Sequence, residues 1–397
     1  MALQPAAGVR DLNPGEVERN RILCDRLAAV YRLWGYRQVA PPTVERADTL
    51  EAGGAIDERE IVRLVSGEPL GLRPELTAPI ARAASTRLAS QPRPLRLWSE
   101  GTIFRSTQGD AGSRILEQLQ SGVELLGEPA AAADAELLLL LLAAAGRLGL
   151  EPRHQPRLLL GHNGLLSLLL ERIPAGQRTA ARTALSTLDA LAINELPLEP
   201  EQRSWLQQLS RLRGEPQAVL TSLRQWLGEQ PLLQQLAHIL ELVVPAAARH
   251  NVSLQLDPSF QPHFALYDGL VLKLVCQGSD APVEIASGGR YDGLVGRFQA
   301  AGDPAVASGV GFGFDVEAIR ELPGLAEKQP DHQGRQLVAF SADAGLAAAL
   351  EALEQLHRQG VVAELHGQPL ADQASAEAVA AERGCAGVTF LAGATLA

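Results

Sequence analysis

Two segments decide the fold of this chain, "GLRPELTAPIAR" at residues 71–82 and "FRSTQGDAGSRILEQLQSGVELLG" at residues 104–127. In each segment a few polar side chains stand among apolar ones. An exposed surface would scatter such groups among many charged residues, whereas a ligand pocket needs a few polar groups in apolar walls. We therefore expect the two segments to line a pocket.

The first segment carries Arg73, Glu75 and Thr77 at alternate positions. On a β-strand this spacing places the three side chains on one face. An ordinary structural ion pair between Arg73 and Glu75 explains the same spacing equally well. In the second segment Gln120 and Glu124 lie among valine and leucine residues, so an apolar stretch carries an amide and a carboxylate.

The composition is that of a soluble globular protein. The 397 residues are 46% hydrophobic and 20% charged, and the length allows two or three domains. A net charge of −11 supplies no basic field and argues against nonspecific nucleic-acid binding. The first residues do not form a secretory signal, and the apolar run at 137–145 is too short to cross a bilayer. We therefore expect a cytoplasmic protein.

Neither a metal site nor a disulfide framework is expected. Cys24, Cys276 and Cys385 are isolated and odd in number. The eight histidines show no metal-ligand spacing. The chain also lacks the Walker A motif and the G-x-S-x-G motif. We therefore predict no metal and no cofactor.

Apolar periodicity divides the chain into a core, an insertion and a C-terminal domain. The core, residues 1–325, contains a helical insertion at about 174–250 with four helix-like segments. Residues 326–334 are a polar linker, and residues 335–397 alternate strand and helix in the pattern of a small α/β domain with parallel strands. Outside the insertion we expect a helix at 15–35, strands within 36–50, at 59–67 and at 68–74, a helix that starts near Leu76, and a strand at 96–106. A polar loop at 107–113 is expected next, followed by a segment at 114–127 that periodicity leaves as strand or helix. A helix at 129–148, a strand at 157–161 and strands between 252 and 315 complete the core.

Two glycine-containing motifs follow the insertion. "SGGRYDGLVGRF" at 287–298 sets a donor, a ring and an acceptor side by side, although a glycine hairpin with a surface ion pair explains it as well. "GVGFGFDVEAI" at 309–319 lacks the spacing of a dinucleotide-binding fingerprint. Its alternating glycines suit a strand packed closely against another backbone or a flat ligand, followed by a helix near Val316.

Nearly the whole chain resembles histidyl-tRNA synthetase, a class II aminoacyl-tRNA synthetase. The resemblance rests on six motifs in order, "GVRDLNPGE", "LWGYRQVAPPTVERADTL", "LRPELTAPIAR", "FRS…EQLQSGVELLG", "GGRYDGLV" and "GVGFGFDVEAI". It implies an α+β fold with an antiparallel-sheet core, helices around the core, and the helical insertion. The C-terminal α/β domain resembles a shortened anticodon-binding domain.

The resemblance also implies a histidine pocket. Glu75 and Thr77 would hold the amino group of the ligand, because an ammonium group needs a carboxylate and neutral acceptors. An imidazole N–H needs a carboxylate or a phenol. Taken alone, Tyr267 fits a turn residue at the start of a strand. The full set of histidine-binding residues that the resemblance implies is Glu75, Thr77, Arg105, Gln120, Glu124, Tyr267, Gly288, Arg290 and Tyr291.

Departures from the synthetase pattern remove groups that adenylation needs. Thr107 stands where the Phe-Arg-x-Glu motif carries its glutamate, and Ala318 stands where the last motif carries its arginine. No arginine occurs from His250 through Gly289, so the histidine-specific "RGLDYY" arginine is absent. Adenylation requires cations around the reacting phosphate. We therefore predict that this chain has no catalytic residue.

A synthetase core that keeps a histidine pocket and loses ATP chemistry resembles the regulatory subunits of ATP phosphoribosyltransferase. That paralogous family joins a short catalytic subunit in the first step of histidine biosynthesis. The resemblance implies a cytoplasmic hetero-oligomer that contains a homodimer of this chain, with histidine as an effector and without tRNA or membrane binding. Two alternatives stay open here, an active histidyl-tRNA synthetase and a histidine-sensing paralogue with another partner.

Overall fold

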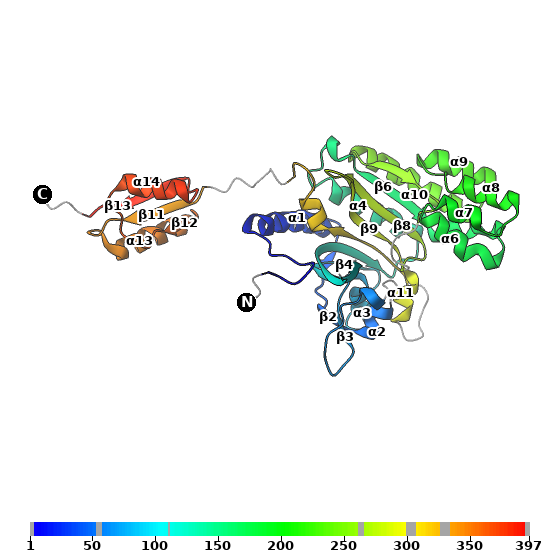
Figure 1. Ribbon diagram of the computed structural model, residues 1–397, viewed down its shortest axis with the longest axis horizontal. Coiled ribbons are helices and arrows are strands. Elements are labelled where there is room, and N and C mark those ends of the chain that lie inside the picture. Colours follow the sequence, from blue (N-terminus) through cyan, green and yellow to red (C-terminus); the bar gives the residue numbers. More distant parts are fainter. Residues whose placement is uncertain are drawn as a thin grey trace. The chain divides into compact units, whose positions relative to one another are not determined.

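The computed structural model describes residues 4–52, 58–109, 112–260, 266–298, 307–325 and 334–393. The chain divides into two compact units, Met1–Ala326 and Glu327–Ala397 (Figure 1). Most of the linker expected at 326–334 lies outside the described residues. The pocket predicted from the sequence belongs to the first unit.

The first unit is built on one eight-stranded sheet. Its strands are β1 (Arg37–Gln38), β4 (Leu95–Gly109), β5 (Gly112–Leu126), β6 (Arg157–His162), β7 (Ser253–Leu256), β8 (Leu270–Gln277), β9 (Pro282–Arg290) and β10 (Gly309–Asp315). They lie in the order β1-β4-β5-β10-β9-β8-β6-β7. The two edge pairs, β1 with β4 and β6 with β7, are parallel, and all pairs between them are antiparallel. The expected α+β fold with an antiparallel core is therefore confirmed, with a parallel pair at each edge.

The longest hairpin of the sheet is formed by β4 and β5, which pair from Leu95 opposite Leu126 to Gly109 opposite Gly112. The segment at 114–127, left open by its periodicity, is therefore a strand. The polar loop expected at 107–113 is wrong for residues 107–109 and 112–113, which are paired within the hairpin, with Thr107 opposite Arg114. Residues 110 and 111 lie outside the described residues. Threonine is favoured in strands, so the polarity of this stretch did not mark a loop.

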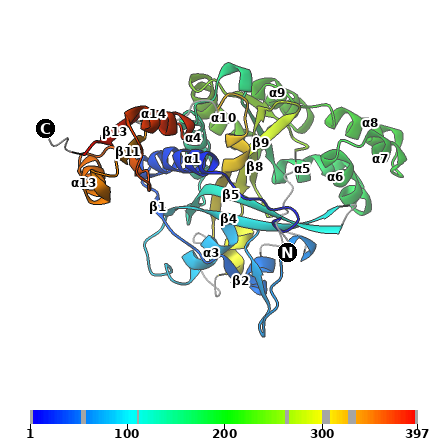
Figure 2. The same cartoon turned by 60° about the vertical axis from the view of Figure 1, so that its left-hand side comes forward.

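Helix α1 (Pro14–Leu33) covers one face of the central strands (Figure 2). A capping box starts the helix, because Asn13 and Glu16 each accept a hydrogen bond from the other's backbone N–H. The buried ring of Tyr31 packs against Trp98 of β4 with ring centroids 5.8 Å apart. This packing fixes α1 on the face of the sheet that lies behind the pocket.

Helix α4 (Ala131–Ala145) belongs to the hydrophobic core that α1 forms with the central strands, and it is apolar nearly all round. Such a helix is stable only where it is buried on several sides, and α4 packs against α1, β10 and α10 (Pro231–Arg249). Helix α10 is also the one helix of the described residues that is long and apolar enough to cross a membrane. Leu233, Leu236, Ile239, Leu240 and Val243 pack into this core and account for much of the apolar composition, whereas Leu242 is 48% exposed.

The helical insertion contains five α-helices where four segments are expected. The first expected segment, residues 177–191, forms two helices. Leu188 separates them, because it adopts a left-handed φ of 56°. The helices of the insertion are α6 (Arg178–Ser186), α7 (Ala190–Glu195), α8 (Pro200–Leu209), α9 (Pro216–Leu227) and α10. The remaining helical elements of the unit after the hairpin are α5 (Asn163–Leu169), α11 (Asp292–Arg297), α12 (Val316–Arg320) and 3-10 turns at Pro152–His154, Leu170–Arg172 and Ala175–Gln177.

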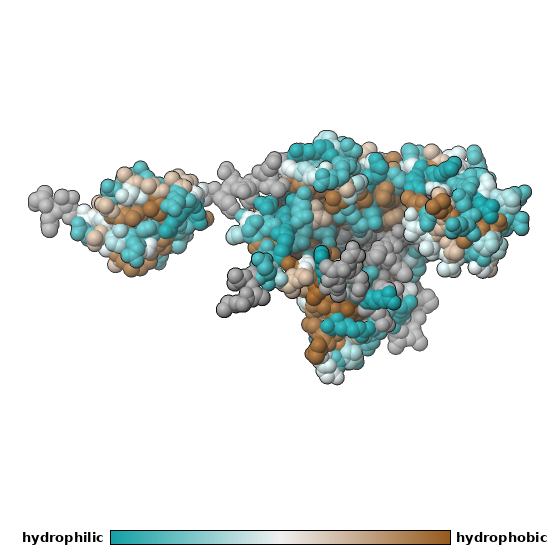
Figure 3. Space-filling view, viewed as in Figure 1, coloured by the Kyte–Doolittle hydropathy of each residue, from teal (hydrophilic) through white to brown (hydrophobic). Residues whose placement is uncertain are grey.

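A small substructure precedes the hairpin in the chain. It consists of the two-stranded sheet of β2 (Val44–Arg46) and β3 (Leu70–Leu72) with the helices α2 (Ala47–Ala52) and α3 (Thr77–Ser85). The strand expected at 59–67 is wrong, since Glu58–Glu60 is a 3-10 helix and only Arg63 forms an isolated bridge, with Gly71. Figure 3 shows apolar residues at the surface over β2 and β3.

The second unit is the α/β domain that the strand–helix alternation predicts. Its elements are β11 (Gln336–Phe340), α13 (Gly345–Arg358), β12 (Ala363–Leu365), α14 (Gln373–Glu382) and β13 (Gly387–Leu391). The three strands are parallel in the order β12-β11-β13. Parallel neighbours require a crossover connection, which the two helices supply.

A buried ion pair joins β9 to α4 in the first unit. Nε and Nη2 of Arg290 each lie 2.9 Å from Oδ1 of Asp134, and the two side chains are 9% and 4% exposed. Arg290 also donates to Asp292 at 3.1 Å. The pair therefore fixes the end of β9, where the chain continues into Tyr291.

We expect Asp134→Ala to lower the free energy of unfolding by about 3 kcal/mol, because it leaves the Arg290 guanidinium buried without its main partner. Asp25→Ala, which removes an exposed pair with Arg21, is the control and should cost less than about 0.5 kcal/mol. Urea unfolding followed by circular dichroism measures both variants. Equally small losses would contradict a structural role for the buried pair.

Candidate functional site

The two segments singled out in the sequence meet at one pocket of the first unit. Its walls come from the start of α3, from β4, β5, β9 and β10, and from the segment before β8. The predicted residues that line it are Glu75, Thr77, Arg105, Gln120, Glu124 and Tyr267. The pocket has a volume of about 30 Å³ and adjoins a cleft of about 360 Å³. Both are lined by Arg105, Gln120, Ser287 and Gly313, so a ligand can extend from one into the other.

Glu75 lies at the N-terminus of α3. The backbone N–H groups of Thr77 and Ala78 donate hydrogen bonds to its carboxylate, that of Ala78 at 3.0 Å to Oε1. The positive end of a helix favours a carboxylate at this place. Burial raises the pKa of Glu75, and the backbone donors act against that rise. The helix therefore holds an acceptor at the wall of the pocket.

Arg73 has a structural role. Its guanidinium donates to the backbone oxygens of Pro41 at 2.7 Å and Thr102 at 2.9 Å, so it ties three separate segments together. Among the described contacts no direct ion pair joins Arg73 to Glu75. The strand expected at 68–74 and the helix expected from near Leu76 are confirmed as β3 and α3. The alternation of Arg73, Glu75 and Thr77 on one strand is wrong, because β3 ends at Leu72 and α3 begins at Thr77.

Glu124 of β5 is the most enclosed carboxylate of the pocket, with 3% of the residue exposed. It accepts hydrogen bonds from the hydroxyl of Thr77 at 2.7 Å and from the phenol of Tyr291. Burial raises the pKa of Glu124 to about 8, although both hydroxyl donors lower it. A carboxylate offers about four acceptor positions, so Glu124 can accept a further hydrogen bond from a ligand.

The glycines of β10 make room for the polar side chains of β5. A Cβ atom at Gly311 would lie 1.7 Å from Oε2 of Glu124, and one at Gly313 would lie 2.5 Å from Nε2 of Gln120. The same Cβ at Gly311 would also lie 2.6 Å from the backbone oxygen of Val123. The alternating glycines of "GVGFGF" thus allow the close approach that the sequence predicts, to side chains as well as to backbone.

Gln120 presents an acceptor that has no partner. Its Oε1 atom is buried, and no group among the described residues donates a hydrogen bond to it. A buried acceptor without a donor costs about 1–3 kcal/mol. Together with Glu75 and Thr77, it gives one small pocket three acceptor groups. A ligand with several N–H donors, such as an ammonium group, would satisfy them.

The adjoining cleft offers few cations among its described lining residues. Glu284 and Asp315 line it together with a single arginine, Arg105. Burial raises the pKa of Asp315, which accepts from the amide of Gln118 at 2.7 Å. Burial lowers the pKa of Arg105, whose Nε donates to the backbone oxygen of Pro74 at 3.0 Å. Across the described parts of the chain, no three histidine, cysteine, aspartate or glutamate residues are grouped so that they could hold a metal ion.

The remaining predicted residues do not line the pocket. Tyr291 reaches it indirectly, through the hydrogen bond from its phenol to Glu124. Arg290 points to Asp134 of α4 instead. A Cβ at Gly288 would lie 2.2 Å from the backbone oxygen of Gly311, so this glycine serves the pairing of β9 with β10. The motif "GGRYD" therefore supports the pocket from behind.

Sequence reasoning missed several residues around the site. Ser287 lines both pocket and cleft, and its neighbour across the strands is Lys273, which pairs with Glu284 at 2.7 Å. Only the pairing of β8 with β9 brings these residues together, and no local pattern reveals it. Asp134 did carry a signal, because it is the lone acidic residue in the first turn of an alanine- and leucine-rich helix.

The sequence of this chain matches one protein-family model and several proteins of known name. The family model for histidyl-tRNA synthetase matches residues 8–319. The ATP phosphoribosyltransferase regulatory subunit of Synechococcus sp. (strain RCC307) is 52% identical over 97% of this chain and 98% of that protein. The protein of the same name from Prochlorococcus marinus (strain MIT 9313) is 50% identical over 98% of this chain and all of that protein.

Solved structures agree with the fold. A crystal structure described as an ATP phosphoribosyltransferase regulatory subunit/histidyl-tRNA synthetase from Bacillus halodurans covers both chains fully, with a TM-score of 0.82 and 26% identity. Histidyl-tRNA synthetase from Nostoc sp. PCC 7120 covers 97% of this chain and 90% of its own, with a TM-score of 0.76 and 19% identity, and so shows the fold alone. On sequence and fold together, the chain belongs to the family of ATP phosphoribosyltransferase regulatory subunits, which is built on the histidyl-tRNA synthetase fold.

Proposed function

We propose that this chain is the non-catalytic regulatory subunit of an ATP phosphoribosyltransferase and that it enables a short-form catalytic subunit in the first step of histidine biosynthesis. Support comes from the 52% identity with a regulatory subunit over nearly the full length of both chains. The phosphoribosyl transfer belongs to the partner. The assembly is a cytoplasmic hetero-oligomer that contains a homodimer of this chain.

The chemistry of the cleft supports a role without adenylation. Adenylation needs cations around the phosphates of ATP, whereas this cleft sets Glu284 and Asp315 beside one arginine. Thr107 and Ala318 occupy the two motif positions that carry a glutamate and an arginine in the synthetase pattern. Because Lys273 is already paired with Glu284 at 2.7 Å, Arg105 is the one cation among the described lining residues left for a triphosphate, and the active-synthetase alternative is disfavoured. In residues 331–397, eight acidic residues against three arginines also disfavour tRNA binding.

The ligand of the pocket, in this proposal, is free histidine. The observation that carries this step is the buried, unpartnered Oε1 of Gln120 beside Glu75 and Thr77, because the α-ammonium of an amino acid would supply the missing donors. The imidazole would lie against Glu124 and Tyr267, whose carboxylate and phenol match a ring N–H. The carboxylate of the ligand would extend toward Arg105 and the cleft, because the inner pocket alone is too small for the whole molecule.

Histidine can regulate the partner only through a difference in affinity. A ligand shifts an equilibrium between active and inactive complexes by the ratio of its affinities for the two states, and by no other route. By the same linkage, binding of the catalytic subunit changes the affinity of this chain for histidine. In this proposal the pocket senses the concentration of histidine. The shift between active and inactive complexes then changes the activity of the catalytic subunit.

Mixing the purified chain with a short-form catalytic subunit tests the function. We expect phosphoribosyl transfer to rise at least tenfold when the chain is added and to fall again when histidine is added. The rate is followed by the absorbance of the phosphoribosyl-ATP product. A catalytic subunit that stays inactive would favour the histidine-sensing paralogue with another partner.

Glu124→Gln is expected to weaken histidine binding at least tenfold, because an amide NH2 group replaces one of the two oxygens of Glu124 and cannot accept a hydrogen bond from the imidazole N–H. Isothermal titration calorimetry of the purified chain measures this affinity. Glu45→Gln is the matched control, since Glu45 is also buried but pairs with Arg82 of α3 at 2.8 Å and does not line the pocket. Equal loss of affinity in both variants would indicate a general structural effect and contradict the assignment of the pocket.

A further inference from the structure

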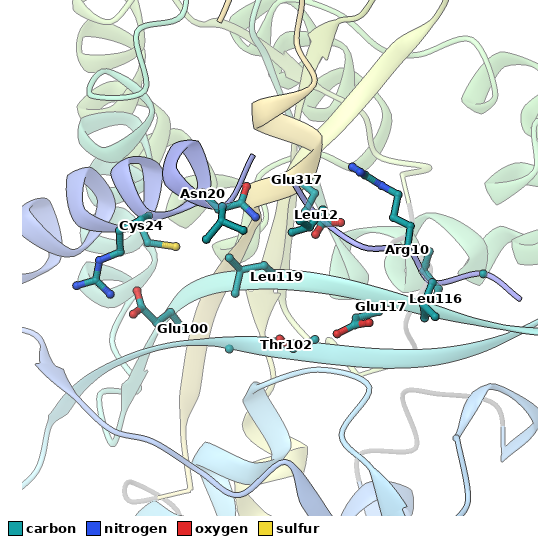
Figure 4. A pocket seen from close by; sticks show the side chains of 15 residues that line it. Arg10, Leu12, Asn20, Cys24, Glu100, Thr102, Leu116, Glu117, Leu119 and Glu317 are labelled. Carbon is teal, nitrogen blue, oxygen red and sulfur yellow. The ribbon is translucent and has the colours of Figure 1, made fainter. Parts of the chain in front are cut away.

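A large cavity, of about 820 Å³, lies between α1 and the β4–β5 hairpin (Figure 4). Two of its carboxylates interact within the chain. The thiol of Cys24 forms a hydrogen bond with Glu100, and the guanidinium groups of Arg320 and Arg10 act on Glu317. The charges of this cavity are therefore largely compensated, whereas a smaller hollow on the other face of the sheet carries a cation without a partner.

This hollow, of about 270 Å³, lies on β6, β7 and β8 at the opposite end of the sheet from β1. Among its described lining residues there is no carboxylate. One guanidinium and three amides form its polar lining, and two aliphatic side chains add apolar surface. The residues are Arg157, Gln155, Gln255 and Gln277, with Leu159 and Val275.

The hollow lies on the same face of the sheet as the pocket. Residues that stand directly opposite each other on neighbouring strands share a face, and Gln255, Leu159, Lys273 and Ser287 form one such row across β7, β6, β8 and β9. Ser287 lines the pocket, and Gln255 and Leu159 line the hollow. Since neighbouring strands are about 4.8 Å apart, Leu159 lies about 10 Å from Ser287. The hollow and the pocket are therefore separate sites on one surface.

An ion pair stands between the two sites. The register of β8 with β9 shifts between Leu274 and Val275, and this irregularity sets Glu284 opposite Val275. Bulges of this kind redirect side chains and are frequent next to functional sites. Here Glu284 pairs with Lys273 at 2.7 Å. The pair compensates the lysine, so Arg157 is the one cation among the described lining residues of the hollow.

The polar groups of the hollow are available to a ligand. Arg157 is exposed, and no carboxylate among the described residues forms an ion pair with it. The side chains of Gln155 and Gln255 likewise form no hydrogen bond within the described parts of the chain. A guanidinium binds an oxyanion through two parallel hydrogen bonds, and a free amide can both donate and accept. The hollow therefore fits an anion that carries a further polar group.

The backbone around Gln155 is fixed in an unusual conformation. Gln155 has a left-handed φ of 41°, which is uncommon for a residue with a side chain. Its N–H donates to the backbone oxygen of Pro152 at 3.1 Å. The buried ring of His154 before it accepts from the backbone of Glu151 at 2.7 Å and contacts the backbone oxygen of Pro323 at 2.8 Å. A glycine would adopt this φ without strain, so the glutamine indicates a use for its amide.

The charges of the hollow favour a carboxylate that has no ammonium group beside it. A phosphate monoester carries about −1.5 to −2 charges at pH 7, whereas the hollow offers one guanidinium. The ammonium group of an amino acid would find no carboxylate among the described lining residues. A 2-oxo or 2-hydroxy acid replaces that ammonium by a neutral oxygen, which an amide N–H can bind.

We propose that this hollow binds a small 2-oxo or 2-hydroxy acid with an apolar body. The carboxylate would pair with Arg157, and the oxo or hydroxyl oxygen would accept from the amide of Gln155 or Gln255. The apolar body would lie against Leu159 and Val275. This site goes beyond the proposed regulatory function and does not depend on it.

Titration of the purified chain with 4-methyl-2-oxopentanoate, followed by ligand-observed NMR in excess histidine, tests the proposal. We expect saturable binding that is at least tenfold tighter than the binding of L-leucine, which has the same body and carboxylate but carries an ammonium group. Inorganic phosphate should also bind at least tenfold more weakly, because it has no body to cover the apolar lining. Arg157→Gln should weaken binding of the oxo acid at least tenfold, because it removes the cation.

Two further variants separate binding from general effects. Arg87→Gln is the matched control, because Arg87 is also exposed, has no ion pair among the described residues and does not line the hollow, and it should change the affinity less than twofold. Gln155→Gly keeps the left-handed backbone and removes the amide. It should weaken binding of the oxo acid without lowering the Tm in thermal unfolding.

Three results would overturn the proposal. The first is the absence of saturable binding of the oxo acid to the wild-type chain. The second is equal affinity for the oxo acid, leucine and phosphate, which would indicate nonspecific attraction of anions to Arg157. The third is loss of binding in Glu124→Gln but not in Arg157→Gln, which would place the ligand in the pocket. None of these measurements involves the catalytic subunit, so failure of this proposal and failure of the proposed function are distinguishable.

Discussion

The pocket depends on the burial of one carboxylate, that of Glu124. Its side chain accepts from Thr77 at the start of α3 and from Tyr291 after β9, so three elements far apart in the sequence are fixed relative to one another. A side chain at Gly311 would occupy the same space, and the glycine is therefore required. Burying a carboxylate in this way is costly unless hydrogen bonds compensate it. The unfavourable free energy of burying Glu124 arises at the place where an imidazole is proposed to bind.

The β4–β5 hairpin contributes residues to both the cleft and the large cavity. Successive residues of a strand face opposite sides of a sheet, and here Gln118 lines the cleft while its neighbour Glu117 lines the large cavity. A histidine molecule in the pocket and any occupant of the large cavity would thus contact the same two strands.

Much of the architecture follows from the sequence, and its local patterns explain why. The strand at β10 and the helices α1 and α4 follow from periodicity, and the pocket residues Glu75, Thr77, Gln120 and Glu124 follow from polar groups in apolar segments. What periodicity could not supply is pairing between distant residues. Arg290 was expected at the pocket. It forms an ion pair with Asp134 of α4 instead, a residue 156 positions away in the sequence. The segment at 59–67 alternates like a strand, yet only Arg63 finds a bridging partner.

Histidine-dependent exchange of ATP with pyrophosphate, measured on the purified chain, tests the central claim most directly. In our proposal the synthetase fold keeps an amino-acid pocket, whereas its cleft, where the described lining carries Glu284, Asp315 and one arginine, no longer supports adenylation. The proposal therefore predicts histidine binding by calorimetry and no exchange above background under the same conditions. Exchange that depends on histidine would contradict it and establish an active synthetase.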